Sequence, residues 1–363
     1  GRVDQLARNS DYTVLSSDIV SAYIDAIAEP AGSTTQTITV AYTPMHGVGA
    51  QTFLASAERC GFGRIEMVPS QAEPDPNFPT LPFPNPEEPG ALDELVALAE
   101  DINADIALAH DPDADRLAVC VRDGQAMRLL TGDEMGSLLA KTLLQNGRTG
   151  TYANSIVSSS LLGKLATTHG QPTVQTLTGF KWIGKVDNLA FGYEEALGYC
   201  VRPDLFGDKD GISAALLVLD YANELHQAGR SLVDELDDLT KEFGVHGTRQ
   251  LSIRFAEVHE IDATLDRFAR QPPLALGNSQ VAVVQNLAAP DDGLPSTPGL
   301  TLSLVDGSRV TCRPSGTEPK LKCYIEEVVE TGSSLTKARE EATQRLDHIM
   351  ADLAVALSGA QAQ

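Results

Sequence analysis

The chain has 363 residues and a formal net charge of −23, with 42% hydrophobic and 21% charged residues. This is the composition of an ordinary globular protein, and the length exceeds the usual domain size of about 100–200 residues, which predicts two or three domains. The negative charge argues against nucleic acid or an anionic membrane as a partner, because both are bound by basic patches.

The first part of the chain alternates strand and helix patterns, which is typical of the α/β class. A helix is expected to begin at Ser17 or Asp18 and to stop at Pro30. The elements that follow are a strand over 37–43, a helix ending near Gly61, a strand over 64–71, a helix over 91–104, a strand over 105–110 and a hairpin over 115–131. Eight prolines within 69–90 predict an extended loop.

A second α/β unit begins near residue 130. Its predicted elements are a helix over 132–147, a strand over 151–159, a helix over 160–170, a strand over 172–177, loops over 178–184 and 192–199, and a long helix from residue 210. Beyond residue 248 the pattern is strand, helix, strand, a turn rich in Pro, Gly and Asp, a strand pair and a helix. This pattern predicts a smaller α+β domain.

Cysteine usage and hydropathy indicate the compartment. The chain has five cysteines without CxxC or zinc-like spacing, namely Cys60, Cys120, Cys200, Cys312 and Cys323. Their apolar surroundings predict buried, reduced thiols. No signal peptide is visible, and the most apolar helical stretch, 212–225, is too short to span a bilayer. We therefore expect a cytoplasmic protein, monomeric or homodimeric, with no membrane or nucleic-acid partner.

Three aspartates at alternate positions, Asp111, Asp113 and Asp115, end an apolar strand in "AHDPDADRLAVC". Side chains on one face of an extended chain recur every second residue, and three carboxylates without a counter-charge would repel one another. We interpret this loop as a compact oxygen-ligand site for Mg²⁺ that leaves positions for water or phosphate oxygen. Arg116 follows directly and is suited to bind the same phosphate.

Other interpretations of this loop fit less well. An EF-hand needs Gly and Glu at loop positions 6 and 12, where this chain has Arg116 and Arg122. A haloacid-dehalogenase phosphatase needs Thr or Val two residues after its second aspartate, where this chain has Asp115 or Leu117. A plain acidic turn is the remaining alternative, although three alternating aspartates before an arginine are unusual for solvation alone.

The segment "RPSGTEPKLK" at 313–322 predicts a phosphate site. It combines Arg313 and the lysines Lys320 and Lys322 with two hydroxyls and a glycine that lets backbone N–H groups approach an anion. It lacks GxxxxGK[ST], so it is not a nucleotide P-loop. The alternative is a polar turn between strands, but local cations in so acidic a chain favour an anion site.

Three further segments carry weaker signals. "TGFKWIG" at 178–184 and "GYEEALGY" at 192–199 are either glycine-bounded turns with aromatic core residues or binding loops. In the second, Glu194 and Glu195 are suited to accept hydrogen bonds from sugar hydroxyls. "GDKDG" offers Lys209 between two acids, or is simply a charged helix cap.

In this order the motifs resemble the α-D-phosphohexomutase superfamily, which comprises phosphoglucomutases, phosphomannomutases and phosphopentomutase-like relatives. The resemblance lies in "AYTPMHGVG", "FPNPEE", "HDPDADR", "TGFKWIG", "EEALGY", "DKDG" and "RPSGTEPKLKCY". It implies two α/β domains with mixed sheets flanked by helices, and a C-terminal α+β domain of the TATA-binding-protein-like type. The expected divisions are the tail of a missing N-terminal domain at 1–29, a metal-binding domain at 30–129, a sugar-recognition domain at 130–247 and a phosphate-binding domain at 248–363.

The resemblance also implies residue roles. Asp111, Asp113 and Asp115 would bind Mg²⁺, and Arg116 would face the transferring phosphoryl group. The implied substrate-binding residues are Thr178, Gly179, Glu194, Glu195, Arg313, Ser315, Gly316, Thr317, Lys320 and Lys322. Lys181 and Lys209 are implied as catalytic residues, either as substrate contacts or as proton-transfer groups.

The implied activity is that of a phosphosugar mutase, which interconverts sugar 1-phosphate and 6-phosphate through a phosphoserine, with a sugar 1,6-bisphosphate as intermediate and activator. Ala196 stands where hexomutases often have Ser, a variant associated with phosphopentomutases and glucose-1,6-bisphosphate synthases. No serine in the chain is followed by His, as the family's phosphoserine would be. We therefore expect the serine domain to be absent and this chain alone to be inactive. Alternatives are a non-catalytic phosphosugar-binding module and a Mg²⁺-dependent phosphatase that uses Asp111 or Asp113 directly.

Overall fold

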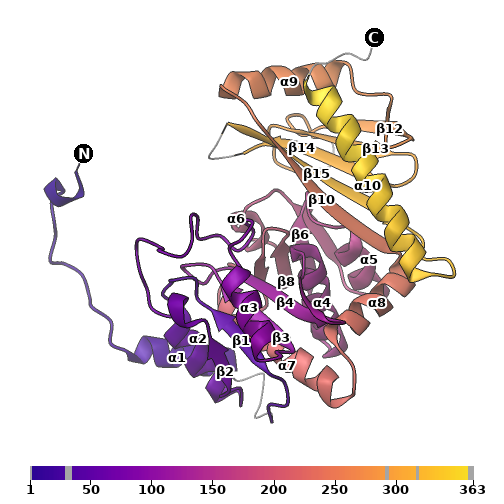
Figure 1. The fold of residues 1–363 in the computed structure, drawn as a ribbon. Coiled ribbons are helices and arrows are strands. Elements are labelled where there is room, and N and C mark those ends of the chain that lie inside the picture. Colours follow the sequence, from indigo (N-terminus) through magenta and orange to yellow (C-terminus); the bar gives the residue numbers. More distant parts are fainter. Residues whose placement is uncertain (1, 29–34, 291–293, 316–318, 359–363) are drawn as a thin grey trace.

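The computed structural model describes residues 2–28, 35–290, 294–315 and 319–358 (Figure 1). In these residues the strands form three sheets, which follow one another along the chain. The C-terminal sheet lies above the other two in Figure 1, and the long helix α10 (Leu335–Ser358) runs along it. No helix in the described ranges is long and apolar enough to cross a membrane.

The first sheet is mixed, in the order β2-β1-β3-β4-β5. Strands β1, β2 and β3 are parallel, whereas β3, β4 and β5 are joined antiparallel. The strands are β1 (Val40–Thr43), β2 (Ile65–Met67), β3 (Ile106–His110), β4 (Leu117–Asp123) and β5 (Ala126–Leu129). The helices that accompany them are α1 (Asp18–Ala28), α2 (Ala50–Arg59) and α3 (Asp93–Asp101). All of β3 is buried, because layers cover both faces of the sheet.

The second sheet is also mixed, in the order β7-β6-β8-β9. Its strands are β6 (Thr151–Ser155), β7 (Thr173–Thr176), β8 (Leu189–Glu194) and β9 (Gly198–Cys200), and only β8 and β9 pair antiparallel. Its helices are α4 (Gly132–Gln145), α5 (Leu161–Thr168), α6 (Phe180–Ile183), α7 (Gly211–Gln227) and α8 (Leu232–Phe243). Thr131 and Glu134 form a capping box at α4, and Asp210 caps α7.

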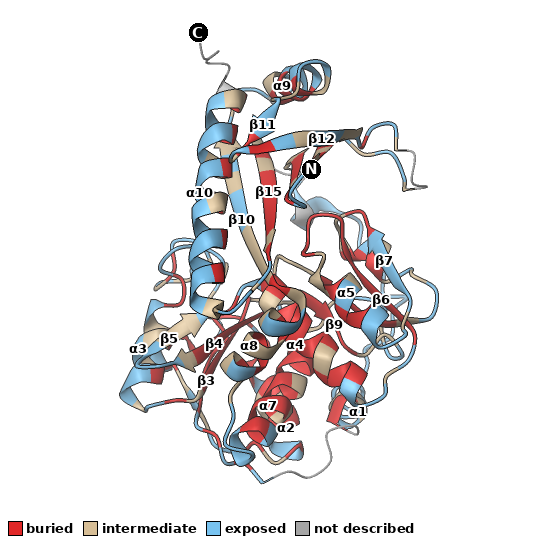
Figure 2. Ribbon diagram, turned by 90° about the vertical axis from the view of Figure 1, so that its right-hand side faces the viewer, coloured by how far each residue is buried: buried red, intermediate tan, exposed pale blue. Residues whose placement is uncertain are grey.

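One hydrophobic core, running from Ile27 to Leu239, serves the first two sheets. Helices α4 and α7 are its most buried helices, and Figure 2 shows them largely red. The C-terminal sheet has its own core, from Ile261 to Leu357, between its strands and helices α9 (Val258–Arg270) and α10. The outer face of α10 is exposed in the same view. A smaller cluster of Ile156, Val157, Leu177, Leu287 and Tyr324 joins the second and third sheets. The hairpin that contains residues 313–322 thus belongs to a body with its own core.

The third sheet is antiparallel throughout, in the order β10-β15-β14-β13-β12-β11. Its strands are β10 (Val245–Arg254), β11 (Ala275–Leu276), β12 (Ser279–Asn286), β13 (Leu300–Leu304), β14 (Arg309–Pro314) and β15 (Lys320–Val329), and its helices are α9 (Val258–Arg270) and α10 (Leu335–Ser358). The fold class expected from the sequence is thus confirmed. The five cysteines, all within the described ranges, are buried free thiols.

Several short elements differ from the sequence-based expectation. The predicted loop over 178–184 contains the one-turn helix α6, and the predicted loop over 192–199 is the turn of the β8–β9 hairpin. Three strands, not two, follow the turn near residue 295. A four-residue helix and a three-residue strand are too short to show a hydrophobic period, so tertiary packing determines them.

Candidate active site

The three aspartates lie in the turn that follows β3. Each offers a carboxylate oxygen, and these oxygens lie within 4.8 Å of one another. Asp111 is buried, Asp115 is half-buried and Asp113 is exposed. The backbone turns back on itself here, because Ala114 N–H donates to Asp111 O over 2.9 Å and Ala114 adopts a left-handed φ of 57°. Three close carboxylate oxygens are a donor set that fits Mg²⁺.

Two cations partly neutralise this cluster. Arg116 Nε donates to Asp111 Oδ2 over 2.7 Å, and the Arg116 backbone N–H donates to Oδ1 over 3.0 Å. Lys209 Nζ lies 2.5 Å from Asp115 Oδ2. Burial raises the pKa of Asp111, and the charge and hydrogen bonds of Arg116 oppose that rise. Arg116 and Lys209, which the sequence predicts to act in catalysis, therefore both contact the aspartates.

The proline-rich loop adds two residues to which sequence reasoning gave no role. Arg116 Nη1 donates to Asn85 Oδ1 over 3.0 Å and lies 3.7 Å from Glu87 Oε2. Both come from the "FPNPEE" segment. Asp111 thus holds the guanidinium at Nε, and Asn85 and Glu87 hold it at Nη1. Arg116 is therefore clamped from two sides.

The loop after β1 supports the aspartates from behind. Val48 N–H donates to Pro112 O over 2.9 Å. A Cβ at Gly47 would come within 2.5 Å of Pro112 Cα, and one at Gly49 would come within 2.5 Å of Ala114 Cβ. Because real Cβ atoms do not approach so closely, these two positions require glycine for the aspartate turn to keep its place.

Glu194 ends strand β8, and the charges of two of the predicted cations act on it. Its Oε1 accepts from Gly179 N–H over 2.5 Å, which places the Thr178–Gly179 turn beside it. Burial raises the pKa of Glu194, whereas the charges of Lys209 and Arg313 lower it. The two cations that act on this carboxylate come from different parts of the fold, because Arg313 belongs to β14 and Lys209 to the turn before α7.

The structure holds Glu195 differently from Glu194. Glu195 Oε2 accepts hydrogen bonds from Ser155 Oγ and Ser158 Oγ, both over 2.9 Å. Burial raises the pKa of Glu195, with the charge of Glu194 adding to the rise. One carboxylate oxygen of Glu195 thus accepts two hydrogen bonds from serines of the same chain. Glu194 differs, because the charges of Lys209 and Arg313 act on it.

Three predicted residues line one small cavity between the second and third sheets. This cavity of about 270 Å³ is lined by Thr178, Lys181 and Arg313 together with Ile156, Leu177, Trp182, Leu287, Ser296 and Thr297. Lys181 is exposed and its Nζ lies 5.9 Å from the centroid of the Trp182 ring. A cation from α6 and one from β14 therefore face the same space.

The β14–β15 hairpin carries the remaining predicted cations. Arg313 pairs with Lys322 across the strands, and Ser315 N–H donates to Lys320 O over 2.8 Å. Gly316 and Thr317 lie outside the described residues. Burial raises the pKa of Glu87, and the charges of Arg116 and Lys322 lower it. Of the hairpin's cations, Arg313 lines a cavity with residues of the second sheet, and the charge of Lys322 acts on the proline-rich loop.

Comparison with known proteins identifies the family of the chain. Residues 21–124 match the family described as phosphoglucomutase/phosphomannomutase, alpha/beta/alpha domain II, and residues 131–243 match its alpha/beta/alpha domain III. A Haemophilus influenzae protein named "Probable phosphomannomutase" is 39% identical over 353 residues, which cover 96% of this chain and 72% of that protein. The phosphopentomutase of Homo sapiens is 35% identical over 331 residues, which cover 81% of this chain and 54% of that protein.

Solved structures show the same fold. The crystal structure of a phosphoglucomutase/phosphomannomutase family protein from Burkholderia thailandensis superposes with a TM-score of 0.66 at 16% identity, covering 94% of this chain and 66% of that one. The chain therefore spans about half the length of the human relative and nearly three quarters of the Haemophilus one.

Proposed function

Because the chain belongs to the phosphoglucomutase/phosphomannomutase family, we propose that it forms the Mg²⁺- and phosphosugar-binding part of a phosphosugar mutase. One observation carries this proposal. Lys209 lies 2.5 Å from Asp115 of the first sheet, and the charges of Lys209 and of Arg313 from the third sheet lower the pKa of Glu194 in the second. The divisions at residues 30, 130 and 248 are proposed to separate metal, sugar and phosphate binding in the same order.

The aspartate loop is the reacting end of the proposed site. Asp111, Asp113 and Asp115 would hold Mg²⁺, which when bound supplies positive charge to a transferring phosphoryl group. Arg116, clamped by Asp111 and Asn85, presents a fixed guanidinium to the same group. Phosphoryl transfer depends on positioning and charge neutralisation more than on covalent help from side chains, which fits such residues.

The other residues hold the substrate. Glu194 accepts hydrogen bonds from sugar hydroxyls next to the Thr178–Gly179 turn, and Arg313 with Lys320 and Lys322 binds the non-reacting phosphate. Lys181 shares a cavity with Arg313 and assists there. Because the phosphate hairpin belongs to a separate body, its hold on one end of the sugar leaves the other end free to meet the aspartates.

In the proposed reaction, a phosphoserine transfers its phosphoryl group to the free hydroxyl of the sugar phosphate and forms a sugar 1,6-bisphosphate. The other phosphoryl group then returns to the serine. None of the serines in these 363 residues is followed by His, so we propose that the donor serine is not among them and that the chain binds ligand without turnover. The buried free thiols fit a cytoplasmic setting.

A pentose phosphate is the second candidate substrate. Ala196 stands where hexomutases often have Ser, a variant associated with phosphopentomutases, and the human phosphopentomutase is a relative of this chain. Calorimetric titration of glucose 6-phosphate, mannose 6-phosphate, ribose 5-phosphate and unphosphorylated glucose into the chain with Mg²⁺ tests both candidates. We expect binding of at least one sugar phosphate and none of glucose. Equal binding of glucose and its phosphate would contradict the proposal.

A further inference from the structure

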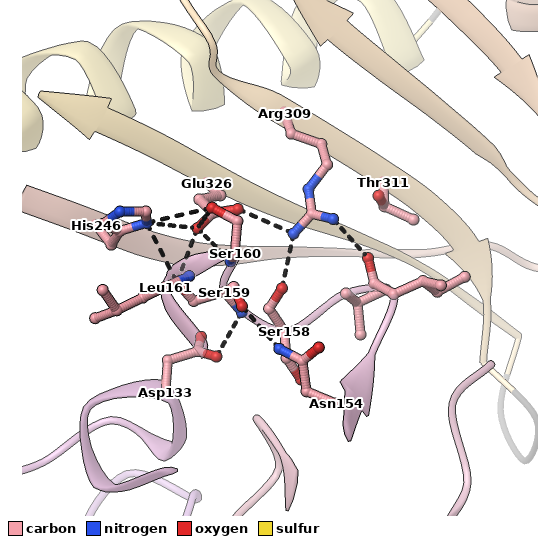
Figure 3. Close-up of polar contacts among 12 residues, drawn as sticks. Asp133, Asn154, Ser158, Ser159, Ser160, Leu161, His246, Arg309, Thr311 and Glu326 are labelled. Carbon is pink, nitrogen blue, oxygen red and sulfur yellow. Dashed lines mark hydrogen bonds and ion pairs between the residues drawn. The ribbon is translucent and has the colours of Figure 1, made fainter. Parts of the chain in front are cut away.

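One loop of the second sheet contacts the C-terminal sheet on one side and the end of strand β8, which carries Glu194, on the other. We call residues 155–160, between β6 and α5, the serine loop, because four of its six residues are serines. It lies directly beneath strands β14 and β15 of the C-terminal sheet (Figure 3). The loop is largely buried, so its polar groups need partners within the protein.

From above, Glu326 of β15 and Arg309 of β14 bind this loop. Glu326 Oε1 accepts from Ser159 Oγ over 2.8 Å, from Ser160 N over 2.7 Å and from Ser160 Oγ over 2.9 Å (Figure 3). Arg309 Nη2 donates to Ser158 O over 2.7 Å and to Glu326 Oε2 over 2.9 Å. His246 Nδ1 lies 3.0 Å from Glu326 Oε1. The carboxylate is 5% exposed, so these contacts replace water.

From below, two other acids tie the same loop to the strand that carries Glu194. Asp133 Oδ1 accepts from Ser159 N over 2.6 Å and from Tyr193 Oη over 2.8 Å. Glu195 accepts from Ser155 and Ser158, as described above. Both neighbours of Glu194 are therefore anchored to the serine loop.

We propose that Glu326 is a positioning residue of the proposed phosphosugar site. Through the serine loop it fixes the β14–β15 hairpin, which carries Arg313 and Lys322, at a set distance from Glu194. The proposal rests on the function proposed above and adds a residue that touches no ligand. Its physical basis is that one buried carboxylate collects several charge-assisted hydrogen bonds across the junction of two separately packed bodies.

The neighbouring residue provides a matched control. Glu327 is also buried, also pairs with an arginine (Arg345) and also accepts from a serine (Ser308). Adjacent residues of a strand point to opposite faces, however, and both partners of Glu327 belong to the C-terminal body. A change at Glu327 thus disturbs the same strand without touching the serine loop.

Glu326→Gln replaces one acceptor oxygen by an NH₂ donor that faces other donors. For this variant we expect the dissociation constant of glucose 1,6-bisphosphate to rise about tenfold and that of Mg²⁺ to stay within about twofold. Hydrogen exchange should also accelerate in the serine loop and at residues 193–199. Glu327→Gln should leave both constants and that exchange unchanged.

Equal effects of the two substitutions, or no effect of Glu326→Gln on sugar binding and exchange, would overturn the proposal. If Glu326→Gln does not fold, Ser159→Ala is the second variant: it removes the hydroxyl that donates to Glu326 and accepts from Leu161 N–H, and it should move the same readouts in the same direction. If the unmodified chain binds no sugar phosphate, the proposed function is wrong. Hydrogen exchange needs no ligand, so it still decides whether Glu326 couples the serine loop to Glu194.

Discussion

Lys209 Nζ lies 2.5 Å from Asp115 Oδ2, so a lysine from the turn before α7 shares one of the three carboxylates that would hold Mg²⁺. Burial lowers the pKa of Lys209, but its hydrogen bond to Asp115 and the nearby negative charges outweigh this and raise it. The lysine therefore stays protonated beside the proposed metal site and competes with the cation for the same oxygen.

Lys209→Met should consequently strengthen Mg²⁺ binding. Removing a unit charge about 4 Å from a divalent ion is worth about 2 kcal/mol at the dielectric constant of water, or roughly a 30-fold gain in affinity. Calorimetry measures the gain, and Lys209→Arg, which retains the charge, should bind Mg²⁺ like the unmodified chain. Weaker Mg²⁺ binding in Lys209→Met would mean that the lysine orients Asp115 and does not compete.

Gly47→Ala should distort the aspartate loop. The added methyl group would meet Pro112 Cα at 2.5 Å, and we expect a loss of about 1–3 kcal/mol in unfolding free energy together with weaker Mg²⁺ binding. Gly63→Ala is the control, because a Cβ there has no atom within 4 Å. Urea denaturation and Mg²⁺ titration measure the two effects. Equal behaviour of both variants would show that the loop tolerates the contact.

Asp133 should make stability depend on pH. Burial raises the pKa of this carboxyl from 3.8 to about 7, against hydrogen bonds from Ser159 and Tyr193. Between these values the folded state keeps a proton that the unfolded state has lost, so this contribution to stability falls as pH rises from about 4 to 7. Asp133→Asn removes this dependence. As pH rises across that window, the free energy of unfolding of the variant should therefore increase relative to that of the unmodified chain, by at most about 1.4 kcal/mol per pH unit.

Urea denaturation at several pH values between 4 and 8 measures this difference. Asp4→Asn, at an exposed position near the N-terminus, should follow the unmodified chain throughout. A difference between Asp133→Asn and the unmodified chain that stays constant with pH would contradict the raised pKa.

The sequence predicted the parts of the site that are local in the chain. Alternating aspartates after an apolar run and a cationic "RPSGT" turn are short motifs whose chemistry can be interpreted without a fold. Asn85 and Glu87 have no such pattern, because they meet Arg116 only when the proline-rich loop folds back onto the turn after β3. The long helices and strands were predictable because their signal is also local in the chain: a hydrophobic period can be recognised once it extends over many residues.

The different environments of Glu194 and Glu195 could not be predicted. Successive residues at a strand end point in opposite directions, so one carboxylate reaches Gly179 and the other reaches Ser155 and Ser158. The role of the serine loop was equally hidden, because Glu326 lies more than 160 residues away in the sequence. A single sequence gives no information on such long-range pairs.

The central claim is that the aspartate loop and the β14–β15 hairpin bind different parts of one ligand. Titration of Mg²⁺ and glucose 1,6-bisphosphate into Asp113→Asn and Arg313→Ala tests it most directly. We predict that Arg313→Ala weakens sugar bisphosphate binding about 10- to 100-fold and leaves Mg²⁺ binding unchanged, while Asp113→Asn weakens Mg²⁺ binding. Loss of Mg²⁺ binding in Arg313→Ala, or undiminished sugar bisphosphate binding in that variant, would contradict the claim.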